Sequence, residues 1–283
     1  MNEQPWWRPV EIDDAATAFW RIGELRLWAS RHPREWRLAA LRDEQADAAC
    51  EHALPCETAV PEVAVWTRHG FRRAPARLRL QPALPDRPVV LAADVPFQLP
   101  PGEELAVYVS LPLWVRVLAG AEEVPLLEEP VTRLSDTWFG PLAGEGELCY
   151  AKGTSARLDL AEIPARLHRA VAPVRIRNGG GGPLPLAGVK LPAPFLSLYA
   201  GADGHVWTEA LTLAREQEGE LATLELEPGA PREAGEAESL APPRVRPERK
   251  TLVRAFGGLL DRARRKGNGD RSAKPRGFGV VEP

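Results

Sequence analysis

Apolar and polar residues alternate between residues 18 and 41 in the way that β-strands require. Phe19 and Trp20 begin the pattern, a polar turn interrupts it at residues 31–34, and apolar side chains then take every second position from Trp36. Successive side chains of a strand point to opposite faces of a sheet. The segment therefore predicts a meander of two or three strands, with aromatic cross-strand pairs contributing much of its stability.

The pattern changes little from Val63 to about Glu227. Short apolar runs, such as residues 105–109 and 113–117, are cut by Pro and Gly at intervals of 8–12 residues. Frequent prolines would break helices, but edge strands and turns accept them. We therefore expect an all-β or β-dominated fold, built as an antiparallel β-sandwich over residues 15–227. It forms either one sandwich or two in tandem, with an internal boundary near residues 119–130, and residues 1–14 form an N-terminal extension.

The C-terminal part of the chain has a different composition. Residues 228–248 are rich in Pro and Glu and predict a linker. Residues 249–266 place apolar side chains at helical spacing, with Arg and Lys on the remaining surface, and predict a basic amphipathic helix that Gly257 and Gly258 weaken. Residues 267–283 predict a disordered tail. The side chains of the helix expected to contact a membrane or a partner are Arg254, Phe256, Leu259, Leu260, Arg262, Arg264 and Arg265.

The charge of the chain is divided along its length. The formal net charge of −3 combines 12 Arg or Lys and 4 Asp or Glu in residues 244–283 with 24 and 35 in residues 1–243. An acidic body with a basic appendage favours a protein partner or an anionic membrane surface. Nucleic acid is a weaker alternative, because no recognised nucleic-acid-binding pattern surrounds the basic residues.

The expected cellular location follows from three further observations. No apolar run reaches the roughly 18 residues that a membrane span needs, and residues 1–7 lack the basic and apolar regions of a signal peptide. Three cysteines in 283 residues do not make a disulfide framework. We expect a cytoplasmic protein. Peripheral attachment of this protein to the inner membrane is the alternative that stays open.

The candidate chemistry lies in two stretches, residues 133–141 and 146–150. A ligand pocket there would use Asp136 and Thr137 as polar contacts and Trp138 as a stacking surface, with Glu147 and Cys149 beside them. A catalytic Cys149 would need a base or a positive field, which His168 or Lys152 would have to supply. The competing interpretation, which we favour, is a structural corner with a packed thiol.

Other candidates are weaker. Cys50, His52 and Cys56 lie within seven residues, and His69 could complete a set of four ligands, but the spacing matches no familiar zinc site. We predict no metal and no cofactor. The glycine run at residues 179–182 is not followed by the Lys and Ser or Thr of a phosphate-binding loop, so it predicts a flexible hairpin loop.

Three strings of residues resemble a known family. They are Trp20–Trp28 (WRIGELRLW), Leu134–Gly140 (LSDTWFG) and Gly146–Ala151 (GELCYA). They resemble an archaeal and bacterial family without an assigned function, the domain of unknown function numbered 432, over roughly residues 15–230. The family carries no assigned chemistry, so the resemblance implies no catalytic residue. It implies an accessory role near a membrane, beside small-conductance mechanosensitive channels.

The function that we favour from the sequence is a non-enzymatic β-sandwich that acts as an interaction or accessory module. An acidic body would bind a protein partner, and the basic tail would anchor it. The alternative is a small-ligand-binding protein or an enzyme with a pocket around Asp136, Trp138 and Cys149. These two classes of function differ in one structural respect, because the pocket requires those side chains to converge on one concave site.

Overall fold

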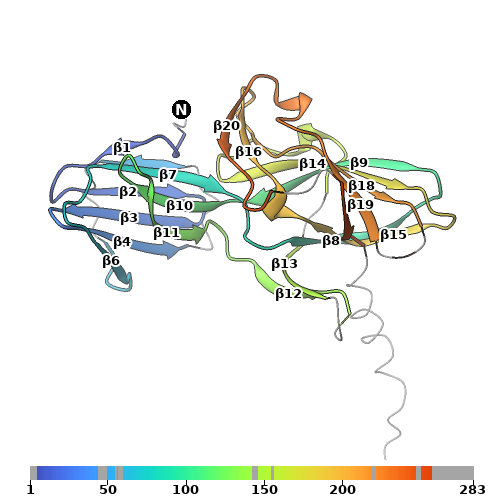
Figure 1. Cartoon of the computed structure of the whole chain (residues 1–283), viewed down its shortest axis with the longest axis horizontal. Coiled ribbons are helices and arrows are strands. Elements are labelled where there is room, and N and C mark those ends of the chain that lie inside the picture. Colours follow the sequence, from blue (N-terminus) through green and yellow to red (C-terminus); the bar gives the residue numbers. More distant parts are fainter. Residues whose placement is uncertain are drawn as a thin grey trace, which may run out of the picture.

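The computed structural model describes residues 5–43, 50–54, 56, 60–141, 146–153, 156–217, 219, 221–246 and 250–256. These residues form 21 strands and three short 3-10 helices, η1 (Leu160–Glu162), η2 (Ala193–Phe195) and η3 (Arg232–Ala234). The β-dominated fold predicted from the sequence is confirmed, and its strand pairs are mostly antiparallel. Figure 1 shows that the strands form two lobes along the long axis of the molecule.

The first lobe consists of two antiparallel sheets. One has the order β5 (Glu51–Ala53), β2 (Thr17–Ile22), β3 (Leu25–His32), β4 (Glu35–Arg42) and β6 (Trp66–Gly70). The other has the order β1 (Val10–Glu11), β7 (Arg77–Ala83), β10 (Trp114–Ala119) and β11 (Val124–Pro130). Strands β2, β3 and β4 are the meander that the alternation predicts. Trp20 and Leu27 on the first sheet share one core with Leu80 and Val117 on the second, so the sheets pack face to face.

The second lobe also contains two sheets. The smaller has the order β12 (Ser135–Phe139), β13 (Glu147–Gly153), β8 (Val89–Leu99) and β15 (Leu184–Leu191). The larger has the order β20 (Ala237–Ala241), β16 (Leu198–Gly201), β17 (Val206–Trp207), β14 (Arg169–Asn178), β18 (Leu211–Arg215), β19 (Leu221–Leu226) and β21 (Lys250–Arg254), and β9 (Glu104–Pro112) pairs with β14. Three pairs are parallel, namely β13 with β8, and β14 with β17 and with β18.

The two lobes are interleaved rather than arranged in tandem. The chain leaves the first lobe between β7 and β8, returns through Leu113 between β9 and β10, and leaves again between β11 and β12. The boundary expected near residues 119–130 falls inside the β10–β11 hairpin, where Ala119 pairs with Val124. Periodicity identifies a strand but not the sheet that it joins, which explains the difference.

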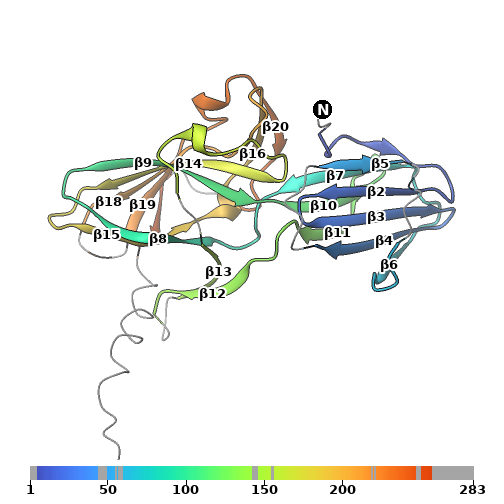
Figure 2. The same cartoon turned by 180° about the vertical axis from the view of Figure 1, so that it is seen from behind.

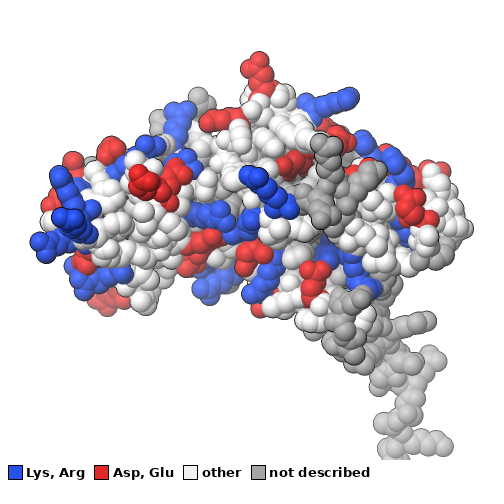
Figure 3. All heavy atoms as spheres, viewed as in Figure 1, with Lys and Arg blue, Asp and Glu red and all other residues white. Residues whose placement is uncertain are grey.

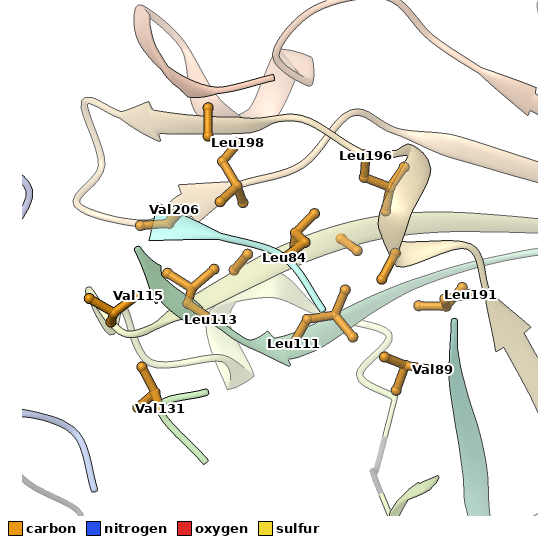
Figure 4. Packing of buried hydrophobic residues seen from close by; sticks show 14 of the residues in the cluster. Leu84, Val89, Leu111, Leu113, Val115, Val131, Leu191, Leu196, Leu198 and Val206 are labelled. Carbon is orange, nitrogen blue, oxygen red and sulfur yellow. The ribbon is translucent and has the colours of Figure 1, made fainter. Parts of the chain in front are cut away.

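One hydrophobic core runs through the junction of the lobes. Leu111, Leu113 and Val115 follow one another at every second position from β9 into β10, and all three are buried. Figure 4 shows these side chains packed among Val131, Leu84 and Val206. Burying an aliphatic side chain of this size contributes about 1.5–3 kcal/mol of transfer free energy. The shared core and the crossing strands therefore join the lobes into one folded unit.

The N-terminal residues that the structure describes are docked on this junction. Trp6 is 3% exposed and its Nε1 donates to the carbonyl of Leu167 at 2.8 Å. Ile12 is fully buried, and β1 adds to the edge of β7. Residues 5–14 thus belong to the body of the protein, where the composition predicted an extension. The indole of Trp6 supplies the hydrophobic area for this docking.

The C-terminal segments differ more from expectation. Residues 228–246, expected to be a linker, contain η3 and β20, and β20 pairs with β16. Residues 250–254, expected to begin the basic helix, form β21 on the edge of β19, and Phe256 makes a bridge to Val189 on β15. The helix prediction is therefore wrong for residues 250–256. The remaining part, residues 257–266, and the tail at 267–283 lie outside the described residues.

The three 3-10 helices in the described part of the chain are each three residues long. No helix in that part reaches the length and apolar character that crossing a bilayer demands.

Candidate functional site

The hairpin formed by β12 and β13 carries all five residues of the predicted pocket. It lies at the edge of the smaller sheet of the second lobe, below that lobe in Figure 1. Its register pairs Asp136 with Tyr150, Thr137 with Cys149, and Trp138 with Leu148. Residues directly opposed in an antiparallel pair point to the same side of the sheet. One face thus carries Asp136, Trp138, Leu148 and Tyr150, and the other carries Thr137, Phe139, Glu147 and Cys149.

The five predicted residues are consequently divided between the two faces. Asp136 and Trp138 lie on one, whereas Thr137, Glu147 and Cys149 lie on the other. Strand alternation separates Leu148 from Cys149, as the sequence indicates, but the pairing of the two strands could not be read from periodicity. The hairpin brings the residues within one element without converging them on one concave site.

The face that carries Cys149 is packed and paired. Cys149 is fully buried in a small cluster with Val90 and Phe139. Glu147 forms an ion pair with Lys190 on β15, and the Nζ atom of Lys190 lies 5.5 Å from the centre of the Phe139 ring. Burial, reinforced by the charge of Glu147 and opposed by that of Lys190, raises the pKa of Cys149 to about 11. A thiol with this pKa stays protonated near neutral pH, which does not suit a nucleophile.

The opposite face of the hairpin exposes two large apolar side chains. Trp138 and Leu148 are directly paired, and each is 43% exposed. The indole of Trp138 is held in place because its Nε1 donates to the carbonyl of Pro141 at 3.0 Å. An ordered aromatic side chain beside an exposed leucine is a common feature of protein-binding surfaces. We call Trp138 and Leu148 the hairpin patch.

Polar groups fix the inner end of the same face. The guanidinium of Arg87 lies 3.1 Å from Asp136 and 5.3 Å from the centre of the Tyr150 ring. The Tyr150 hydroxyl donates to Asp86 at 2.8 Å, and its ring packs on Trp114. Burial and the bond to Asp86 raise the pKa of Tyr150 to about 12, so the hydroxyl remains a donor. These contacts attach the hairpin to the core and border the hairpin patch with one charge of each sign.

Lys152 and Cys149 point to opposite faces of the sheet, because side chains alternate along β13. Lys152 pairs with Leu91 on the side of the sheet that faces the core, near the junction of the lobes. Burial, strengthened by the charge of Arg169 and opposed by that of Glu24, lowers the pKa of Lys152 to about 7. Desolvation of an ammonium group has this sign because it disfavours the charged form. The cation near Cys149 is instead Lys190, which no sequence motif marks.

The other predicted site residues are more scattered. Arg254 lies on β21 and is partly buried, and Phe256 is only 2% exposed, so Phe256 is a core residue and not a membrane contact. The expected contacts Leu259, Leu260, Arg262, Arg264 and Arg265 lie outside the described residues.

The residues weighed as metal ligands have other neighbours. His52 stacks on Trp20 with ring centres 4.9 Å apart, and partial desolvation lowers the pKa of its imidazole although the residue remains exposed. Cys50 is buried in the core. Among the described residues, no group of three or more His, Cys, Asp or Glu side chains is placed to hold a metal ion.

Comparisons with known proteins agree with the resemblance seen in the sequence. The model of a family described as protein of unknown function (DUF432) matches residues 6–261. No curated protein and no solved structure matches the chain. The match spans both lobes and most of the described residues, including the hairpin of β12 and β13. The chain therefore belongs to the DUF432 family.

Proposed function

We propose that the protein is a non-enzymatic interaction module whose hairpin patch docks a protein partner. The observation that carries this proposal is the pair of Trp138 and Leu148, each 43% exposed on an edge hairpin. Trp at the centre of an interface is a frequent source of binding energy. The ion pair between Arg87 and Asp136 supplies a polar rim next to it.

The alternative of a ligand pocket or active site at the hairpin has less support. It requires Asp136 and Trp138 to face the same space as Cys149, and the strand register directs them to opposite sides. The raised pKa of Cys149 also opposes a nucleophilic role. The geometry of the hairpin favours a binding surface over a pocket.

Photo-crosslinking tests the hairpin patch directly. A photoreactive amino acid replaces Leu148 in the full chain, which is expressed in the source cells, and irradiation should give one dominant crosslinked product. The same amino acid at Leu158, which is 69% exposed elsewhere on the second lobe, is the control and should not give that product. The same product from both positions, or none from either, contradicts the proposal.

The identified partner is then purified and its affinity measured. Trp138→Ala should weaken binding by about 2 kcal/mol or more, the loss typical of a central aromatic contact. Leu158→Ala should leave the affinity unchanged. Because Trp138 is half-exposed, its loss should cost the fold little, and thermal unfolding of both variants checks this point. Equal affinity of Trp138→Ala and wild type would exclude the patch from the interface.

A second candidate function, attachment to an anionic membrane surface, rests on the charge of the chain. Residues 257–283 contain seven Arg or Lys and three Asp or Glu, whereas residues 1–256 contain 29 and 36. Over the face seen in Figure 3, acidic and basic side chains are interspersed on both lobes. We propose that the basic residues after Phe256 hold the module at the cytoplasmic face of the inner membrane, where a mechanosensitive channel is one candidate partner for the hairpin patch.

Vesicle flotation tests the membrane candidate. The full chain should float with vesicles containing anionic lipid and remain behind with neutral ones, because each basic residue near such a surface contributes about 1 kcal/mol. A chain ending at Phe256 keeps β21 and the bridge to β15, so it isolates the effect of the basic residues. It should lose flotation. Equal recovery of the two chains with anionic vesicles would remove residues 257–283 from the mechanism.

A further inference from the structure

A groove of about 260 Å³ lies on the outer face of the larger sheet of the second lobe. Strands β9, β14 and β18 form its base, and the segment that contains η3 forms one wall. The Tyr108 hydroxyl donates to Glu233 at 3.1 Å, and the buried Ala234 packs in a cluster with Trp207. These contacts hold η3 over the sheet. We call this feature the η3 groove.

The floor of the η3 groove contains an unpartnered hydroxyl group. Thr212 pairs with Arg175 on one side and Glu225 on the other, which places it on the outer face, and its neighbours Leu211 and Leu213 point into the core. Thr212 is only 7% exposed and lines the groove, yet its hydroxyl makes no hydrogen bond to any described residue. The hydroxyl opens onto the groove, where it can donate one hydrogen bond and accept others. A hydroxyl group of a bound ligand could make these bonds.

The walls of the η3 groove offer charges of both signs in equal number. Arg175, which pairs with Glu104 at 2.9 Å, lies 3.5 Å from Glu227, and the exposed side chains of Arg232 and Glu233 stand at the η3 wall. Two guanidinium groups and two carboxylates give no net field that would select an anion or a cation. They do provide planar donors and planar acceptors, which bind pairs of hydroxyl groups well.

The neutral hydroxyl of Tyr108 adds a further polar group. Burial, together with the charge and hydrogen bond of Glu233, raises the pKa of Tyr108 above its ordinary value. The volume of the groove lies just below the range of about 300–1,000 Å³ for sites that hold drug-sized ligands, so a ligand of one or two rings fits. We propose that the η3 groove binds a neutral, hydroxyl-rich ligand, namely a monosaccharide or disaccharide or the terminal unit of a glycan.

A binding screen with the purified full chain tests this proposal. The chain is passed over immobilised monosaccharides and disaccharides, and over free amino acids and dipeptides as a second panel. We expect retention of at least one saccharide and measurable affinity for it in titration calorimetry. Retention of no saccharide, or of amino acids and dipeptides alone, overturns the proposal.

Matched variants then place the bound saccharide. Thr212→Val should weaken its binding about five- to tenfold, the loss expected for one hydrogen bond, and Arg232→Gln should weaken it about tenfold or more because its bonds are charge-assisted. Thr223→Val and Arg177→Gln, on the same face of the sheet but not lining the groove, should leave the affinity unchanged. Thermal unfolding verifies that all four variants fold. If Thr212→Val and Arg232→Gln bind as tightly as wild type, the η3 groove is not the site.

Discussion

Replacing Asn178 with alanine should destabilise the protein by on the order of 3 kcal/mol, because it removes the centre of a buried polar network. Asn178 is fully buried at the end of β14. Its Nδ2 donates to the carbonyls of Leu99, Pro100 and Gly182 at 2.8, 3.0 and 3.0 Å. Its Oδ1 accepts from Arg215 at 2.8 Å. The variant would leave three carbonyls and a guanidinium with fewer partners.

Part of this expected loss comes from Arg215. Its side chain is 2% exposed and would lose both of its hydrogen bonds to Asn178, while it keeps the one to the Gly182 carbonyl. Urea denaturation measures the effect as a lower midpoint. Arg177→Ala, one residue away, is the control, because Arg177 is exposed and pairs with Glu104, so its loss should cost less than about 1 kcal/mol. Equal midpoints for the two variants would show that the network does not hold the fold.

The network also explains why the glycine run was misjudged from the sequence. Four consecutive glycines predict a flexible hairpin, since glycine has the greatest conformational freedom. The run instead connects β14 in the larger sheet to β15 in the smaller one. Arg215 lies close to Gly180, where a Cβ atom would approach its guanidinium to 3.0 Å. The residue that fixes the loop is thus distant in the sequence, and local composition cannot reveal it.

The strands themselves could be predicted, but their arrangement could not. Alternation located the meander of β2, β3 and β4 because these strands are consecutive and joined by tight turns. It could not show that β9 and β10, separated only by Leu113, belong to different lobes. It also could not show that β14 pairs with β9, β17 and β18. Sheet membership depends on hydrogen bonds between distant segments, which a periodic pattern does not encode.

The candidate site shows the same limit. The strings around Trp138 and Cys149 stood out in the sequence, and the structure places them in one hairpin. The charged partners of the hairpin, Lys190 for Glu147 and Arg87 for Asp136, come from β15 and from the segment between β7 and β8, and they carry no motif. Thr212 in the η3 groove was missed for the same reason, because a threonine between apolar strand residues is ordinary.

In the C-terminal segment, the spacing of the apolar residues favours a helix, whereas the residue types favour a strand. Leu252, Val253 and Phe256 fit the spacing of a helix, but Thr251 and Val253 are β-branched, which favours a strand. In the structure Val253 turns toward the core and Leu252 is 67% exposed. The segment ends at Phe256, which bridges to β15, so residues 250–256 connect the edges of both sheets of the second lobe.

This arrangement predicts a large effect of Phe256→Ala. Phe256 is 2% exposed within the core, and truncating a buried phenylalanine costs about 3–5 kcal/mol through lost burial and the cavity that remains. Leu252→Ala, on the same segment but exposed, should change the free energy of unfolding by less than about 0.5 kcal/mol. Urea denaturation of both variants measures the contrast. A basic helix separate from the body would instead make both substitutions neutral to stability, and that result would show that residues 250–256 do not close the second lobe.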